Sequence, residues 1–411
     1  MQEQATINVL DIDLNGQEFL SDPYPLYDRV RAENPVHWNE SDKHWYITRY
    51  VDVMAMLKDP RLSSNRIRAL AKTLPEKTQG NITPLVDAIS SWMLQSDPPS
   101  HTRMRGLVNK AFTPRMIEGL RSRIQYLVDG MLDDVQGNGG MDVLADLAVP
   151  MPGIVISDML GVPPEDQPQF KKWSSEITGR YVAGGGSVSL SDLYELSQKS
   201  FFELSDYFRE IIETLRGNPK DNLLSAMVEA EEAGDKLTTD ELIANCVLLM
   251  FAGNETTTNL IGNGMLALLQ NPEQLGMLQG NAELIGHAVE ELLRYDSPVQ
   301  KTARMAIEDI EIGDEVINAG DLVMLCYGSA NRDPEQFEDP NRLDITRADN
   351  RHLAFAQGIH YCLGSALARI EGQIAINALV QRLPDIKLAG DAPERCPTTH
   401  IWGFKALPVS F

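Results

Sequence analysis

Apolar residues recur at helical spacing along most of the chain, which predicts a mainly helical protein. This spacing predicts helices over residues 27–32, 51–57, 116–135, 149–160, 165–180 and 192–216. A further helix is expected to begin at Pro99-Ser100, with Ser100 as its N-cap. Strand-like alternation is confined to residues 44–50, 310–317 and 322–326. We therefore expect a mainly α fold with a small β region.

Two segments depart from this helical pattern. Residues 62–94 show no clear period and are rich in small side chains, so we expect them to be irregular. The run Gly184-Gly185-Gly186 is expected to be a flexible break, suited to a mobile loop over a cavity.

The longest predicted helix has an unusual middle. Thr238 and Glu241 form a capping-box pattern, and the apolar spacing then continues to about Gln270. Such a helix would be about 45 Å long and would cross the whole domain. Its middle, residues 252–258, holds a glycine, three threonines and Glu255, which suit neither a regular helix nor an apolar environment. Either Glu255 lies at the surface and the threonines bond back to the helix, or the helix widens and presents an acid and a hydroxyl to a cavity.

Several charged residues could act together in the fold. Glu291 and Arg294 are spaced i,i+3 on one predicted helix, although most such pairs are weak surface contacts. His101 and Arg105 are spaced i,i+4 and share a face of another helix. Together with Arg304 and His360 from elsewhere in the chain, they would suit a ligand that carries two carboxylates.

Cys362 lies in a glycine-containing turn before a predicted helix. Gly358 precedes it by four residues and Gly364 follows it by two, and helical spacing begins at Ser365. The start of a helix favours a thiolate, and a thiolate is a strong ligand for heme iron. A buried structural cysteine in a turn is the alternative, and this segment alone does not decide between them.

Composition and length fit one large globular domain. The chain has 411 residues, of which 43% are hydrophobic and 23% charged, and it shows no internal repeat. We expect an N-terminal extension over residues 1–17 and a single domain over residues 18–411. The N-terminus lacks the features of a secretory signal, and the most apolar run, residues 246–253, is too short to span a bilayer. A cytoplasmic protein with free cysteines is expected.

The charge balance excludes some partners. A net charge of −23 argues against nucleic acid and against anionic membrane surfaces. Residues 101–123 are the exception, with a single acid, Glu118, and six basic residues: Arg103, Arg105, Lys110, Arg115, Arg121 and Arg123. This basic segment is either a solvated helix face or a docking site for an acidic partner.

Taken together, these residues resemble the cytochrome P-450 family, in particular its soluble bacterial heme-thiolate monooxygenases. The resemblance runs from about residue 18 to residue 411 in the expected order. The family's cysteine motif is matched by Phe355, Gly358, Cys362 and Gly364, its Ala-Gly-x-acid-Thr motif by Ala252, Gly253, Glu255 and Thr256, and its Glu-x-x-Arg motif by Glu291 and Arg294, with a distant arginine partner at Arg342. The chain departs from the family at Ala356, where a glycine is usual, and at Glu255, where many members have aspartate.

The resemblance implies a cofactor and roles for these residues. Cys362 would be the axial ligand of heme b (iron protoporphyrin IX), and its electron donation would favour O–O cleavage. The heme propionates would be neutralised by His101, Arg105, Arg304 and His360. Thr256 would position oxygen or water at the heme and Glu255 would help deliver protons, so that one oxygen atom enters a C–H or C=C bond. Glu291, Arg294 and Arg342 would be structural.

The resemblance also implies a substrate class and partners. Substrate contacts would come from Met93, Leu249, Ala252, Val299, Gln300, Ile401 and Trp402, which are mostly apolar. A hydrophobic or amphipathic small molecule of secondary metabolism is therefore expected. The chain has no flavin or nicotinamide fingerprint, so ferredoxin and ferredoxin reductase would supply electrons from NAD(P)H to a monomeric enzyme, with an acidic ferredoxin docking on residues 101–123.

Two other functions are consistent with heme binding. One is a heme-thiolate enzyme for oxidative bond formation or peroxide-driven oxidation. The other is a heme sensor or carrier without turnover. The Glu255–Thr256 pair argues against a dedicated peroxygenase and against a carrier, because neither needs proton delivery to O2.

Overall fold

The structure, a computed structural model, describes residues 13–72, 76–177, 190–232, 237–390 and 393–411. Its helices are α1 (Gln17–Ser21), α2 (Tyr24–Glu33), α3 (Tyr50–Met56), α4 (Ile67–Lys72), α5 (Glu76–Ser90), α6 (Ser100–Ala111), α7 (Pro114–Gly119), α8 (Arg121–Gln136), α9 (Pro150–Met159), α10 (Gln167–Ile177), α11 (Leu190–Gly217), α12 (Leu223–Glu232), α13 (Thr239–Gln270), α14 (Pro272–Gly280), α15 (Ile285–Tyr295), α16 (Tyr327–Ala330) and α17 (Ser365–Arg382). Short 3-10 turns lie at η1 (Met93–Gln95), η4 (Ala282–Leu284) and η5 (Gly358–His360), and a π-helical turn at η2 (Leu144–Ala148).

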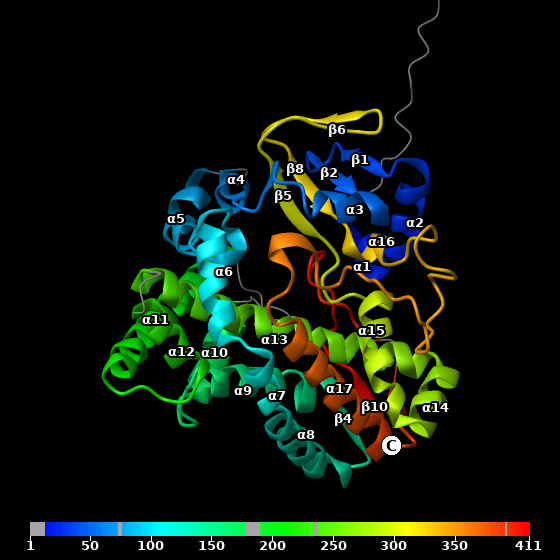
Figure 1. Ribbon diagram of the computed structural model, residues 1–411. Helices are drawn as coiled ribbons and strands as arrows, with labels where there is room; N and C mark the ends of the chain where they lie inside the picture. Colours follow the sequence, from blue (N-terminus) through cyan, green and yellow to red (C-terminus); the bar gives the residue numbers. More distant parts are fainter. Residues whose placement is uncertain (1–12, 73–75, 178–189, 233–236, 391–392) are drawn as a thin grey trace, which may run out of the picture.

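The strands are short and form three small sheets. The strands are β1 (Val36–Asn39), β2 (His44–Ile47), β3 (Leu62–Ser63), β4 (Gly140–Asp142), β5 (Thr302–Ala306), β6 (Ile310–Ile312), β7 (Glu315–Ile317), β8 (Leu322–Leu325), β9 (Lys387–Leu388) and β10 (Pro408–Ser410). The largest sheet has the order β1-β2-β8-β5-β3, in which β2 and β8 are parallel and the other pairs antiparallel. This sheet lies at one end of the molecule, beside the helical body (Figure 1). The predicted mainly α fold with a small β region is confirmed.

Some predicted elements differ from the observed ones. The prediction that residues 62–94 are irregular is wrong, because they contain β3, α4, α5 and η1. The internal Pro84 weakens the sequence signal of α5, but this helix packs on α11. Ser100 is also not an N-cap: Pro99 holds that position, and no side chain caps α6. The glycine run 184–186 lies outside the described residues.

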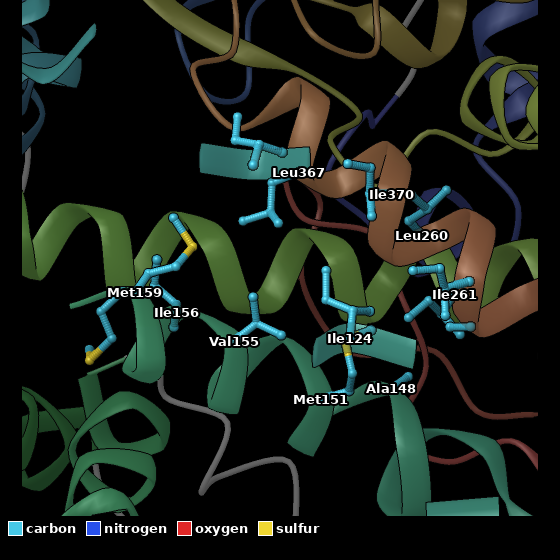
Figure 2. Close-up of a cluster of buried hydrophobic side chains, with 14 of the residues drawn as sticks. Ile124, Ala148, Met151, Val155, Ile156, Met159, Leu260, Ile261, Leu367 and Ile370 are labelled. Carbon is cyan, nitrogen blue, oxygen red and sulfur yellow. The ribbon is translucent and has the colours of Figure 1, made fainter. Parts of the chain in front are cut away.

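Helix α13 crosses the middle of the fold and organises its core. Its predicted capping box is present, since Thr238 accepts from the Glu241 amide and the Glu241 side chain accepts from the Thr238 amide. Figure 2 shows α13 between α17, which contributes Leu367 and Ile370, and residues of α9 such as Val155. Glycine allows the close approach of α17, because a Cβ at Gly372 would lie 2.9 Å from a methyl of Leu260. This close apolar packing fixes the position of α17 relative to α13, and with it the position of their accessible residues.

The N-terminal part of the described chain packs on the main sheet. Leu14 is fully buried, and its carbonyl accepts a hydrogen bond from the Lys301 ammonium at 3.0 Å. The ammonium also lies over the Phe19 ring, 4.7 Å from its centroid. The boundary between an extension and the domain at residue 17 stays a prediction. Within the described residues, every helix is either too short or too polar to cross a membrane.

Candidate functional site

The loop before Cys362 is folded back on itself by a backbone contact. The Cys362 amide donates to the Phe355 carbonyl at 2.9 Å. Gly358 has φ +73°, and a Cβ there would lie 2.7 Å from the Leu57 carbonyl oxygen. Ala356 has φ 57°, a left-handed conformation that strains a residue with a Cβ by about 1–2 kcal/mol. The departure from glycine at position 356 therefore adds strain but leaves the loop closed.

Cys362 is half-buried and lies three residues before the first residue of α17. Burial raises the pKa of its thiol, and a hydrogen bond from the Gly364 backbone and the charges of Arg105 and Arg369 only partly oppose this. The backbone at the helix start does favour the thiolate, as expected, but in the protein alone burial outweighs that contribution. A Cβ at Gly364 would meet no atom within 4 Å, so there is open space at this position two residues after Cys362. A metal ion bound by the sulfur would hold it deprotonated.

Cationic side chains converge beside the cysteine loop, as predicted for a ligand with two carboxylates. The His101 and His360 rings are 4.2 Å apart, and burial together with the charge of Arg304 lowers the pKa of His360 to about 3. Burial and then Arg105 lower the pKa of His101, and both buried ring nitrogens of His101 lack a hydrogen-bond partner. The charges of the neighbouring arginines disfavour protonation of both histidines, and an anion placed among these groups would be attracted to the arginines.

Arg66 is a further member of this cluster that sequence reasoning missed. Burial and the neighbouring Arg304 lower the pKa of Arg66 to about 10. The preceding Ser64 contacts His360, with its Oγ 2.9 Å from Nε2. Asp97 is a nearby acid, but it already accepts from the Ser63 hydroxyl and the Ser64 amide. Arg66 lies in the segment expected to be irregular, so no periodic signal marked it.

The middle of α13 is accessible although most of the rest of the helix is buried. Ala252 is exposed, and Leu249, Gly253, Glu255 and Thr256 are half-buried. The predicted widening is absent, since α13 is α-helical throughout. The Thr256 hydroxyl instead donates to the Ala252 carbonyl at 2.9 Å, which confirms back-bonding for this residue. The acid and the hydroxyl nevertheless lie on an accessible stretch of a helix that crosses the core.

Glu291 and Arg294 form a fully buried ion pair rather than a surface contact. Both side chains are 0% exposed, and two N–H···O bonds of 2.8 Å join them. The prediction that Arg342 is the third side chain of this ion-pair group is wrong. Its side chain is exposed and only its carbonyl accepts from Arg294, whereas the Arg347 guanidinium reaches Glu291 at 3.2 Å. Both arginines lie in one loop, and sequence spacing could not tell which side chain points inward.

Two of the predicted substrate contacts belong to the core instead. Gln300 donates to Tyr24 and to the Ser297 carbonyl, and Trp402 is fully buried with its ring edge-on to Phe19. Their neighbours Val299 and Ile401 pair in a β-bridge and are half-buried. Successive side chains of an extended segment point in opposite directions. Gln300 and Trp402 therefore point into the core, and Val299 and Ile401 point to the opposite side. Met93 is buried, and its amide donates to Asn245 at 3.2 Å.

Glu371 on α17 is a buried acid that the sequence reasoning also missed. It is 1% exposed, and its Oε2 has no hydrogen-bond partner among the described residues. Burial raises the pKa of Glu371 to about 8, and a hydrogen bond with Thr257 of α13 only partly opposes this. The available signal was a glutamate within the apolar pattern of residues 365–383.

We expect Glu371→Gln to stabilise the protein at alkaline pH. Because the folded-state pKa is raised above the unfolded value, the stability that the protonated acid contributes is present below about pH 4.5 and is lost as the pH rises through about 8. Glutamine keeps the neutral form, so the melting temperature should rise by about 5 °C at pH 9 and stay unchanged at pH 5. Glu311→Gln, at an exposed position of β6, is the matched control. An equal effect of Glu371→Gln at both pH values would contradict the prediction.

Comparisons with known proteins agree with this arrangement. The family model described as Cytochrome P450 matches residues 67–405. The polyketide biosynthesis cytochrome P450 PksS of Bacillus subtilis (strain 168) is 42% identical over 96% of this chain and 97% of its own length. The cytochrome P450 monooxygenase PikC of Streptomyces venezuelae is 41% identical over 98% of this chain and 95% of its own.

Solved structures show the same fold. The structure of PksS has a TM-score of 0.87 at 41% identity and covers 97% of this chain and 99% of that one. P450BioI, in complex with an acyl carrier protein ligated to hexadec-9Z-enoic acid, has a TM-score of 0.85 at 41% identity, covering 96% and 99%. These findings do not support a carrier without turnover, since the named relatives include a monooxygenase. The chain belongs to the cytochrome P450 family and is a heme-binding monooxygenase.

Proposed function

We propose that Cys362 is the iron ligand of the heme and that Arg66, His101, Arg105, Arg304 and His360 neutralise its propionates. The cationic cluster carries this proposal, because burial and the charges of Arg304, Arg66 and Arg105 lower the pKa of His360, and the buried ring nitrogens of His101 have no hydrogen-bond partner among the described residues. The open space at Gly364 and the exposed Ala252 fit a flat cofactor. When bound, the heme supplies the oxidising chemistry that activates O2. A CO-difference spectrum of the reduced protein tests the ligation: absorption typical of imidazole would overturn it.

We propose that Thr256 and Glu255 handle protons on the accessible side of α13. The Thr256 hydroxyl donates its hydrogen to the Ala252 carbonyl. Its oxygen can still accept a hydrogen bond from a donor such as water. Glu255 is half-buried one residue earlier, where a carboxylate can exchange protons with solvent. The pair would therefore hold water and protons at a defined place beside the substrate.

Thr256→Ala is expected to uncouple oxygen consumption from product formation. The variant keeps the helix but lacks the hydroxyl, so product per NAD(P)H should fall by about tenfold while NAD(P)H consumption persists. Product, peroxide and NAD(P)H are measured together. Thr256→Ser, which retains the hydroxyl, should recover much of the coupling. Full coupling in the alanine variant would exclude a proton-handling role.

We propose a hydrophobic or amphipathic substrate from secondary metabolism, such as a polyketide or an acyl chain. Leu249, Val299 and Ile401 offer half-buried apolar surface. Among the relatives, PksS is named for polyketide biosynthesis and P450BioI is seen with a fatty acyl chain on its carrier protein. Screening such compounds for a shift of the heme spin state identifies binders. Products that gain no oxygen atom would favour oxidative bond formation instead.

We propose that an acidic ferredoxin, reduced by ferredoxin reductase, docks on the basic segment of residues 101–123, and that the enzyme acts as a monomer in the cytoplasm. Three of its arginines already have acid partners: Arg103 with Glu241, Arg121 with Glu118 and Arg123 with Asp158. Arg115 is exposed on α7, which packs against α17, the helix that follows Cys362. We therefore assign Arg115 more weight than the paired arginines.

The double variant Arg115→Glu/Arg121→Glu should slow reduction by ferredoxin. Reversing charges on a steering surface lowers the association rate, here by about tenfold at low salt, and the difference should shrink as salt is added. Stopped-flow reduction over a range of salt concentrations measures both effects. Arg209→Glu, on the exposed face of α11, is the control. An unchanged rate and salt dependence would exclude this docking surface.

A further inference from the structure

We propose that a cavity between α9, α10 and α13 is a second small-molecule site, which takes a neutral, mainly apolar molecule with one hydroxyl or N–H donor. The cavity has a volume of about 380 Å³. Its apolar walls include Ile154, Ile156, Phe170 and Met250, and its polar members are Ser157, Gln167, Lys171, Ser174 and Asn254. Helices α9 and α10 pack against each other and against α13, which runs through the middle of the helical body (Figure 1).

The volume and the mainly apolar lining of the cavity indicate the size and polarity of the ligand. Small-molecule pockets in proteins run from about 300 Å³ upward and are mostly apolar. Gly153 of α9 lines the cavity, and a Cβ there would be in van der Waals contact with the Asn254 amide nitrogen at 3.5 Å, so a larger side chain at this position would extend into the cavity. Lys171, the cation of the lining, is exposed at the rim, which disfavours a cationic ligand.

Asn254 supplies the polar anchor of the proposed site. Its amide nitrogen donates weakly to the Ser174 hydroxyl at 3.3 Å, whereas its buried Oδ1 has no partner among the described residues. Ser157, also in the lining, already donates to the Gly153 carbonyl at 2.7 Å. An unsatisfied buried acceptor destabilises a protein by about 1–3 kcal/mol, so a donor on a ligand would be favoured at Oδ1.

The cavity is separate from the face of α13 that carries Ala252 and Thr256. At about 100° per residue, Asn254 points about 200° away from Ala252 around the helix axis. Ile156, on the cavity side, lies 3.7 Å from where a Gly253 Cβ would be. A molecule in the cavity would thus contact α13 at Asn254, next to Glu255 in the chain. It would lie on the side of the helix opposite the face that carries Ala252 and Thr256.

Binding can be tested in the holoenzyme while a nitrogen-donor azole saturates the heme pocket. The probes are a fluorinated phenylethanol and the methyl ether of the same alcohol, followed by fluorine NMR and calorimetry. We expect one equivalent of the alcohol to bind in the presence of the azole, about tenfold more tightly than the ether, which cannot donate to Asn254. Displacement of the alcohol by the azole, or an ether that binds equally well, would overturn the proposal.

Two variants locate the site. Gly153→Leu should fill the cavity and abolish alcohol binding, while Gly130→Leu, at an exposed helical glycine with nothing within 4 Å of an added Cβ, should bind normally. Asn254→Leu should bind the ether at least as well as the alcohol, and it tests the anchor even if Gly153→Leu folds poorly. Unchanged binding to a folded Gly153→Leu protein, or an unchanged preference for alcohol in Asn254→Leu, would place the probe elsewhere and refute the site.

Discussion

We expect Cys362→Ala to lose the heme-thiolate spectrum and to lower monooxygenase activity by at least about a thousandfold. Cys362, the proposed ligand, closes the loop of residues 355–362 just before the start of α17. Without the proposed thiolate ligand, the electron donation that favours O–O cleavage would be lost. The CO-difference spectrum, heme content and product formation would be measured on the same preparation.

Two further variants separate loss of the ligand from loss of the fold. Cys396→Ala changes another half-buried cysteine, and we expect it to keep the wild-type spectrum. Cys362→His offers a neutral nitrogen ligand, so heme should be retained with a shifted CO band and little turnover. A thiolate spectrum that persists in Cys362→Ala would assign the ligand to another cysteine.

The features that could be predicted from the sequence are mainly local ones. The capping box at Thr238 and the Glu291–Arg294 pair depend on residues three positions apart, so helical geometry alone brings their side chains together. The cysteine motif is equally local, since its closing hydrogen bond spans residues 355–362. Local spacing was therefore enough for the family resemblance and for the proposal of Cys362 as the ligand.

What the sequence could not give depends on contacts between distant segments. Arg66 joins the cationic cluster only because its segment folds against Arg304 and His360. The raised pKa of Cys362 is likewise a result of burial, which outweighs the helix start that the sequence showed. The orientation of Gln300 depends on which side of an extended segment faces Tyr24. In each case contacts between distant segments determine the position or the pKa of the side chain, and the spacing of residues in the sequence does not indicate it.

Glu291→Ala is expected to destabilise the fold by about 3–5 kcal/mol, because it leaves buried positive charge unpaired. Glu291 accepts from Arg294 and Arg347, and also from the Asp344 amide at 2.9 Å and the Asn350 amide at 3.1 Å. Arg294 in turn donates to the carbonyls of Asn331 and Pro340, so one carboxylate ties α15 to the loop that leads toward Cys362. Thermal and denaturant unfolding, with the yield of heme-loaded protein, would measure the loss.

The same spacing at the surface provides the matched control. Glu118 and Arg121 are also i,i+3, but their side chains are 61% and 44% exposed. Glu118→Ala should therefore change stability by less than about 1 kcal/mol. Glu291→Asp, which keeps the charge on a shorter side chain, should fall between wild type and Glu291→Ala. Similar unfolding curves for Glu291→Ala and Glu118→Ala would show that burial adds nothing to this pair. A larger loss confined to Glu291 would instead assign it the structural role, because removing this acid leaves the fully buried Arg294 and the largely buried Arg347 without their carboxylate.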